Sequence, residues 1–129
     1  MASGSAKVRD RATRWGWRTD VAVRVNGKDM KDAVIRTDQF EMRILELIPD
    51  HLKVAVKENS GHPFNFVPRF FEMIYPEKSI AAKDNGIISV GAGKTVEVII
   101  EFREKLRIET FTTMELRYAR KKLAGISVE

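Results

Sequence analysis

The chain has 129 residues, of which 43% are hydrophobic and 32% are charged, and its formal net charge at pH 7 is +5. This length suits a single domain with one two-layer core, and no apolar run is long enough to cross a bilayer. The absence of cysteine excludes disulfides, thiolate nucleophiles and cysteine-ligated metals.

The positive charge is concentrated near the N-terminus. Residues 7–18 carry five basic side chains and one acidic side chain, which leaves 18 basic and 17 acidic residues in the rest of the chain. We therefore predict a basic, tryptophan-bearing arm over residues 1–18 and a single domain over residues 19–129. Because the body carries no basic stripe that continues the arm, the charge distribution argues against nucleic acid as the partner.

From residue 20 to residue 102, apolar residues fall mainly on alternate positions. This period of two is typical of antiparallel strands with one buried face and one exposed face. Asn26-Gly27 follows the first such run and predicts a tight turn, because both residue types tolerate positive φ. Within residues 40–47 the phase of the alternation reverses, which predicts a β-bulge.

The middle of the chain is divided by loop signals. Residues 59–63 read Asn-Ser-Gly-His-Pro and predict a loop, and Pro68 interrupts the aromatic segment that follows. That segment predicts two short strands, or one edge strand bent at the proline. Residues 76–86 predict a longer loop, and the runs 87–90 and 95–102 predict a hairpin-like pair.

Residues 112–124 fit two structures. Thr112 and Glu115 match a capping box, which favours a short C-terminal helix. Met114, Leu116 and Tyr118 also alternate with charged residues, which favours a pair of strands. We prefer the strand pair, because it would complete a sheet already made of strands.

Roughly eight to ten short strands with regularly spaced turn signals predict an all-β fold, an antiparallel β-sandwich. Residues 52–63 end in Asn-Ser and a Pro-centred loop, and residues 88–102 place a Gly-Lys-Thr turn before a strand that ends in Phe. With residues 64–74 between them, these stretches resemble bacterial immunoglobulin-like domains of secreted and cell-envelope proteins. The resemblance implies an immunoglobulin-like fold and a periplasmic or cell-surface location, and it carries no catalytic residues. The lack of cysteine is equally compatible with the cytoplasm.

No motif predicts catalysis, a cofactor or a metal. Gly93-Lys94-Thr95 matches the end of a phosphate-binding loop, but Ile88 stands where that loop needs glycine, and a β-branched run follows instead of a helix. His51 and His62 are the only histidines, and no further ligands are placed to join them. We therefore expect a protein that is not an enzyme.

Two groups of residues are candidates for binding. Phe70 and Phe71 are adjacent and would point to opposite faces of a strand, so one of them should be exposed, and Tyr75 extends this aromatic segment. The second group lies in the arm, where guanidinium and indole groups suit anionic ligands. It consists of Arg14, Trp15, Trp17 and Arg18.

We expect a non-enzymatic interaction or structural module of a bacterial cell-envelope or surface assembly. A protein partner, or a second copy of the chain, would bind at a sheet edge or at residues 64–75. The alternative is a domain that binds a small anionic ligand or a nucleotide through the basic arm.

Overall fold

The computed structural model describes residues 8–9, 17–18 and 22–129. The regular elements in this part of the chain are strands and one 3-10 turn, and the strands pair antiparallel. The all-β prediction is therefore confirmed. Residues 113–128 form two strands of one hairpin, so the strand pair is confirmed and the alternative of a C-terminal helix is wrong.

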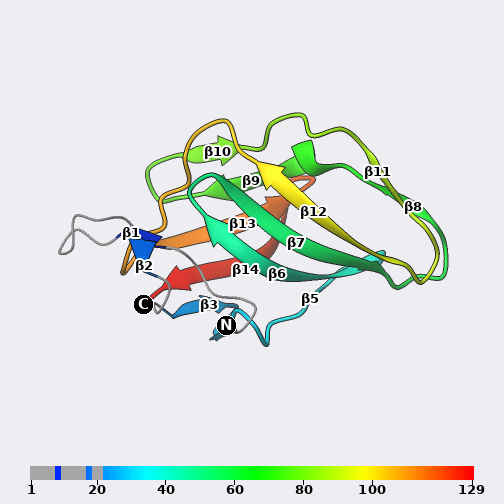
Figure 1. Ribbon diagram of the computed structural model, residues 1–129, viewed down its shortest axis with the longest axis horizontal. Helices are drawn as coiled ribbons and strands as arrows, with labels where there is room; N and C mark the ends of the chain where they lie inside the picture. The colour runs from blue at the N-terminus through cyan, green and yellow to red at the C-terminus, as the bar shows by residue number, and fades with distance from the viewer. Residues whose placement is uncertain (1–7, 10–16, 19–21) are drawn as a thin grey trace.

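The strands form two main sheets, shown in Figure 1. One is six-stranded, with the order β10 (Ser79–Ala81), β9 (Phe71–Ile74), β13 (Thr113–Tyr118), β14 (Lys121–Val128), β3 (Val23–Val25) and β4 (Lys28–Asp29). The other is four-stranded, with the order β12 (Thr95–Glu101), β7 (His51–Glu58), β6 (Phe40–Ile48) and β5 (Ile35–Arg36). Two short ribbons pair β8 (Phe64–Phe66) with β11 (Ile88–Val90), and β1 (Val8–Arg9) with β2 (Trp17–Arg18).

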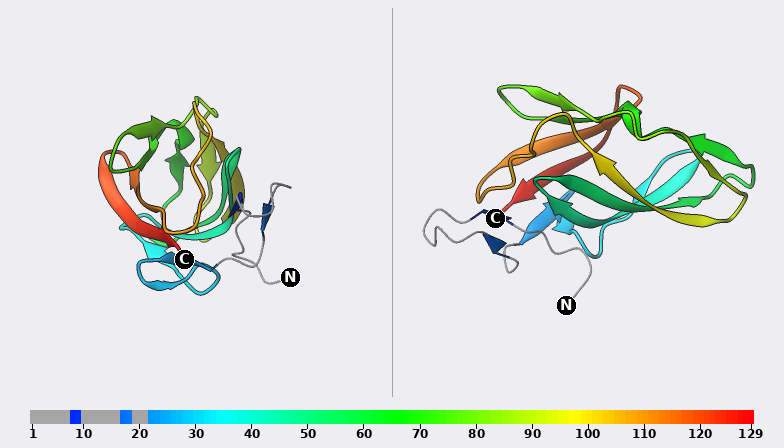
Figure 2. Two further views of the ribbon diagram at one scale, coloured as in Figure 1. Left: turned by 90° about the vertical axis from the view of Figure 1, so that its left-hand side faces the viewer. Right: turned by 45° about the horizontal axis from the view of Figure 1, so that its top comes forward.

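The two main sheets curve around one hydrophobic core, as the end-on view in Figure 2 shows. Alternation in the sequence sets which side chains enter this core: Leu52, Val54 and Val56 of β7 are fully buried, while Lys57 on the same strand is exposed. Each such buried aliphatic side chain contributes about 1.5–3 kcal/mol relative to its exposed state. Burial of this regular pattern is what holds the sheets face to face.

The local turn signals appear where the sequence places them. Asn26 and Gly27 have φ values of 52° and 81° and join β3 to β4, as a tight hairpin turn requires. The pairing of β6 with β7 shifts register between Ile44 and Glu46, so the predicted bulge is confirmed. The aromatic segment forms two short strands, β8 and β9, and the 3-10 turn Pro68–Phe70 separates them.

Two expectations from the sequence are wrong. Residues 76–86 are not all loop, because β10 lies within them and its Ile80 is buried. The runs 87–90 and 95–102 are not a hairpin, because β11 pairs with β8 while β12 pairs with β7. Val90 packs at the aromatic end of the core, whereas Val98 and Ile100 belong to the four-stranded sheet. The intervening turn therefore connects two different ladders.

Glu58, at the end of β7, joins the loop that follows this strand to the turn that precedes β12. Its Oε1 accepts the Gly93 N–H at 2.8 Å, and its Oε2 accepts the Ser60 hydroxyl at 2.6 Å and also the Ser60 N–H. The next residue, Asn59, donates its N–H to the Gln39 carbonyl at 3.0 Å. The Gly-Lys-Thr turn thus uses its Gly93 N–H for the protein's own carboxylate, in the place where a phosphate-binding loop would hold phosphate.

These contacts lower the pKa of Glu58 from 4.5 to about 2: the Ser60 hydroxyl contributes most, and the Gly93 and Ser60 N–H groups add to it against the effect of burial. Because this pKa is lower in the folded state, the carboxylate stabilises the fold fully above pH 4.5 and loses that contribution as the pH falls towards 2. We expect Glu58→Gln to lower the melting temperature at pH 7 and the difference from the parent protein to shrink between pH 4.5 and pH 2. Thermal unfolding followed by circular dichroism across this range measures both effects.

Glu104→Gln is the matched control, because Glu104 makes an exposed ion pair with Lys78 and accepts no such set of backbone N–H groups. It should change the melting temperature little. A Glu58→Gln variant as stable as the parent protein at pH 7 would show that the carboxylate does not hold the loops.

Candidate protein-binding surface

An aromatic cluster fills one end of the core and joins the two sheets. Tyr118 of β13 stacks on Phe66 with ring centroids 5.5 Å apart, and it meets Phe40 of β6 edge-on at 5.7 Å. Its ring also lies 4.8 Å from that of Phe71. The Tyr118 hydroxyl accepts the Val67 N–H at 3.0 Å, and burial raises the pKa of this hydroxyl. These contacts fix the position of Tyr118 and so of the turn that follows it.

Phe70 is an exposed aromatic residue at the edge of this cluster. Pro68 begins a 3-10 turn that ends at Phe70, and the turn directs the Phe70 side chain outwards before β9 begins at Phe71. Phe70 is 41% exposed, and its ring meets that of Tyr118 at 5.9 Å. The guanidinium of Arg69 lies 5.4 Å from the Phe70 ring centroid. An aromatic ring is thus exposed on a rigid support.

The turn between β13 and β14 lies beside the 3-10 turn that precedes β9 (Figure 1). Its two central residues, Ala119 and Arg120, have φ values of 51° and 68°, in the left-handed region that L-residues other than glycine seldom adopt. The Ala119 N–H donates to the Phe70 carbonyl at 3.0 Å. This hydrogen bond and the packing of Tyr118 hold the strained turn against the 3-10 turn.

Two hollows flank the β13–β14 turn. The first has a volume of about 420 Å³. Its lining residues are Arg69, Phe70, Glu72, Ala81, Ala119 and Arg120. The second has a volume of about 550 Å³ and lies on the side of the loop that precedes β6. Its charged lining residues are Arg36, Asp38, Lys121 and Lys122. Cationic residues therefore outnumber carboxylates in both hollows.

We call Arg69, Phe70, Ala119, Arg120 and Lys121 the Phe70 surface. All five are exposed. Within the part of the chain that the structure describes, Arg69, Arg120 and Lys121 have no carboxylate at ion-pair distance. An exposed aromatic ring with unpaired cations around it is the composition that protein interfaces favour, since Phe and Arg are enriched there.

Phe71 and Tyr75, the other two partner-binding candidates from the sequence, do not reach this surface. Phe71 is fully buried and Tyr75 is 3% exposed, so neither side chain is available to a partner in the folded protein. Tyr75 has a structural role: its hydroxyl accepts the Arg107 N–H at 2.8 Å and donates to the Arg107 carbonyl at 3.2 Å. Burial raises the pKa of Tyr75 to about 12. Phe71 is buried as the first residue of β9 and Tyr75 directly after the strand, whereas Phe70, in the preceding 3-10 turn, is exposed.

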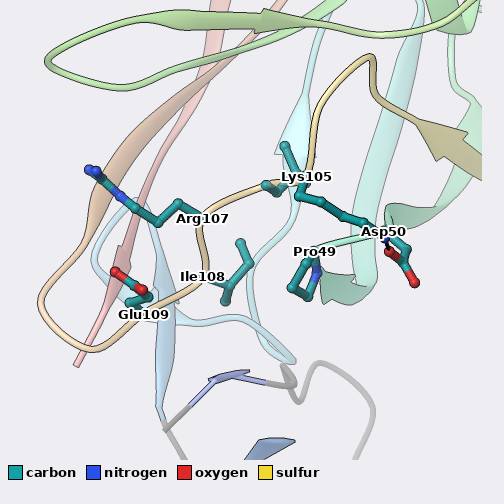
Figure 3. Close-up of a pocket in the computed structure, with 7 residues that line it drawn as sticks. Pro49, Asp50, Lys105, Arg107, Ile108 and Glu109 are labelled. Atoms are coloured by element: carbon teal, nitrogen blue, oxygen red, sulfur yellow. Dashed lines mark hydrogen bonds and ion pairs between the residues drawn. The ribbon is translucent and has the colours of Figure 1, made fainter. Parts of the chain in front are cut away.

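Tyr75 anchors the loop that leads into β13, and this loop borders the hollow drawn in Figure 3. The hollow has a volume of about 480 Å³ and lies between residues 105–109 and the β6–β7 turn at Pro49 and Asp50. Lys105 pairs with Asp50 across it, and the Leu106 N–H donates to the Pro49 carbonyl at 2.9 Å. Its charges are mixed and partly paired, so it is a weaker candidate than the Phe70 surface.

The remaining candidates are placed as follows. Arg14 and Trp15 lie outside the described residues, and Trp17 and Arg18 form β2, whose backbone pairs with β1. His51 hydrogen-bonds Glu46 at 2.6 Å, and the described residues include no group of three or more ligands arranged for a metal. The sheet edge at β12 is partly covered, because the Lys83 N–H donates to the Glu101 carbonyl at 2.8 Å.

Reasoning from the sequence found Phe70 but missed Arg69, Arg120 and Lys121. Arg69 and Arg120 are 51 positions apart, so no local pattern brings them together. The run Arg120-Lys121-Lys122, directly after the alternating residues 114–118, was the one available signal. It marks the turn of a hairpin with concentrated positive charge.

Tyr75→Phe removes both hydrogen bonds to Arg107 while it keeps the ring. Because the Arg107 N–H and carbonyl would lose their partner, we expect a loss of about 1–3 kcal/mol in the free energy of unfolding. Urea denaturation with a fluorescence readout measures this loss. Phe111→Ser, at a side chain that is 89% exposed, serves as the control and should change stability by less than about 0.5 kcal/mol. Equal stability of Tyr75→Phe and the parent protein would contradict the anchoring role.

Ala119→Gly relieves the left-handed conformation of the β13–β14 turn. We expect a gain of about 0.5–1 kcal/mol, because glycine adopts positive φ without steric cost and loses only part of this gain to chain entropy. Ala55→Gly, inside β7, is the control and should destabilise the protein by about 0.5–1 kcal/mol. Thermal unfolding measures the change in melting temperature of each variant relative to the parent protein. The two changes should have opposite signs if the turn is strained and the same sign if it is not.

Comparisons of the chain with protein-family models, with curated proteins and with solved structures found no match. Among the described residues, no helix is long and apolar enough to span a membrane. The functional interpretation therefore depends on the geometry and charge of the Phe70 surface.

Proposed function

We propose that this protein is a non-enzymatic interaction module that binds a protein partner through the Phe70 surface. The proposal depends on the exposure of Phe70 in a fixed position. The Phe70 ring packs on Tyr118, and the backbone carbonyl of Phe70 accepts a hydrogen bond from the β13–β14 turn. A preorganised aromatic anchor loses little conformational entropy when it is covered, so it favours binding.

The hollow beside Phe70 supports this mode of binding. A volume of about 420 Å³ accommodates one or two side chains of a partner, and Ala81, Ala119 and Phe70 supply apolar contacts on its walls. Arg69 and Arg120 lie at the same hollow and can form hydrogen bonds around the apolar contact. An apolar centre with a polar rim is the usual organisation of a protein–protein interface.

The ionisable groups with shifted pKa values have structural roles, which also supports a non-catalytic function. Glu58 binds backbone N–H groups of two loops, Tyr75 bonds the backbone of Arg107, and Tyr118 bonds that of Val67. Perturbed pKa values at catalytic sites accompany groups that face a cleft. Here the polar atoms of all three groups are hydrogen-bonded to the chain's own backbone, including the hydroxyl of Tyr118, whose ring lines the second hollow.

The resemblance of residues 52–63 and 88–102 to bacterial immunoglobulin-like domains supports a place for this module in a cell-envelope or surface assembly. Domains of this kind present surfaces and loops on a stable sandwich. The Phe70 surface, made of two turns at one end of the sheets, is such a presented surface.

Phe70→Ser tests the proposal. Peptides are first selected from a random display library on the immobilised parent protein, and their affinities are then measured for each variant. We expect Phe70→Ser to weaken binding of the selected peptides at least tenfold, about 1.4 kcal/mol, because it removes the apolar anchor. Phe111→Ser removes another exposed phenylalanine and should leave the affinities unchanged.

The choice of Phe70 matters for the interpretation. Phe71→Ser would place a hydroxyl in the core and cost several kcal/mol, so any loss of binding would report unfolding. Selected peptides that bind Phe70→Ser as tightly as the parent protein would contradict the proposed surface.

A further inference from the structure

We infer that the partner's binding segment is acidic, with carboxylates on either side of an apolar side chain that packs on Phe70. This inference rests on the proposed function and adds the chemical class of the partner. It comes from Arg69, Arg120 and Lys121 around the β13–β14 turn, which no carboxylate of the described residues pairs with.

The turn concentrates more positive charge than the carboxylates of the described residues neutralise. Arg117 and Lys122 are opposite each other in the β13–β14 ladder, and like charges in this position repel. Glu115 reduces this repulsion, since its carboxylate pairs with Arg117 and lies 4.0 Å from the Lys122 ammonium group. Arg120 and Lys121 follow in the same hairpin, and within the described residues no carboxylate pairs with either one. An external anion would compensate them.

The backbone at Arg120 indicates that the side chain itself is needed. Its φ of 68° would suit glycine or asparagine, and an arginine there is strained. A residue that breaks a local rule without a gain in stability is often kept for function. At this position the guanidinium of Arg120 lines the hollow beside Phe70.

The positions of the cations predict the order of side chains in the partner. Arg69 lies over the Phe70 ring, with its guanidinium carbon 5.4 Å from the centroid, and Arg120 lines the same hollow from the neighbouring turn. An apolar side chain placed in this hollow on Phe70 would therefore lie close to both cations. Arginine binds carboxylates through two parallel hydrogen bonds, so carboxylates flanking the apolar residue complete the fit.

The charges that line the two hollows favour an acidic protein segment over a nucleic acid. Glu72 lines the first hollow and Asp38 the second, and both would repel a closely spaced row of phosphates. The domain outside residues 7–18 is nearly neutral and offers no continuous basic track for a nucleic-acid backbone. Separate carboxylates around one apolar residue can avoid Glu72 and Asp38, whereas a phosphate backbone cannot.

The test uses the whole chain and a labelled nine-residue peptide with one central leucine flanked by aspartate and glutamate. Fluorescence anisotropy should show binding that weakens as the salt concentration rises, and a peptide with lysine in place of the acidic residues should bind at least tenfold more weakly. Arg120→Gly should weaken binding of the acidic peptide about five- to tenfold while it raises the melting temperature. Arg43→Ala, at an exposed arginine of β6 that lies outside the Phe70 surface, is the control and should leave binding unchanged.

The outcomes separate this inference from the proposed function. If display selection yields peptides that depend on Phe70 but not on Arg69 or Arg120, the protein-binding function stands and the acidic class is wrong. If Phe70→Ser has no effect on any peptide, the proposed surface itself fails. If a single-stranded oligonucleotide binds more tightly than the acidic peptide and Arg120→Gly abolishes that binding, the partner class is nucleic acid and the inference is overturned.

Discussion

The packing of Tyr118 is the contact on which the rest of this structure depends. Its ring lies between Phe40 of the four-stranded sheet and Phe71 of the six-stranded sheet, and it stacks on Phe66 of the small ribbon. Each aromatic pair of this kind adds about 0.5–1.5 kcal/mol beyond the burial of its area. The cluster closes one end of the sandwich, and it determines where the 3-10 turn and the β13–β14 turn meet.

That rigid base explains how the fold tolerates an unfavourable turn. Two residues at positive φ cost about 1–2 kcal/mol each, and exposed like charges add only tenths of a kcal/mol because water screens them. Burial of the aromatic rings contributes more than these penalties together. The strained and charged β13–β14 turn is therefore stable without a partner, and the exposed side chains of Arg120 and Lys121 can bind a partner protein.

At the end of β7, where Glu58 pairs with Phe40 in the ladder, the loops are held by charge instead of by rings. Glu58 accepts hydrogen bonds from Ser60 and Gly93, and its ionised form is favoured by those donors. The Gly-Lys-Thr turn illustrates how a short motif depends on its surroundings. The N–H of Gly93 binds a carboxylate of the same chain, because a strand follows the turn and the helix that would complete a phosphate site is missing.

The sequence by itself determined most of the strands, the Asn26-Gly27 turn and the bulge near Leu45, because each depends on neighbouring residues. The strands follow from alternation of apolar residues, the turn from two residues that tolerate positive φ, and the bulge from one extra residue in the ladder. It did not determine which strands pair. β10 is too short to be recognised from the sequence, and it becomes evident as a strand only through its pairing with β9. β11 pairs with β8 and β12 pairs with β7, although β11 and β12 are neighbours in the sequence.

Adjacency predicted that Phe70 or Phe71 would be exposed, but the 3-10 turn and the ring of Tyr118 decided that it was Phe70. Arg69 and Arg120 meet only because the Ala119 N–H bonds the Phe70 carbonyl. A contact between residues 49 positions apart leaves no periodic trace in the sequence, so only the tertiary structure could reveal it.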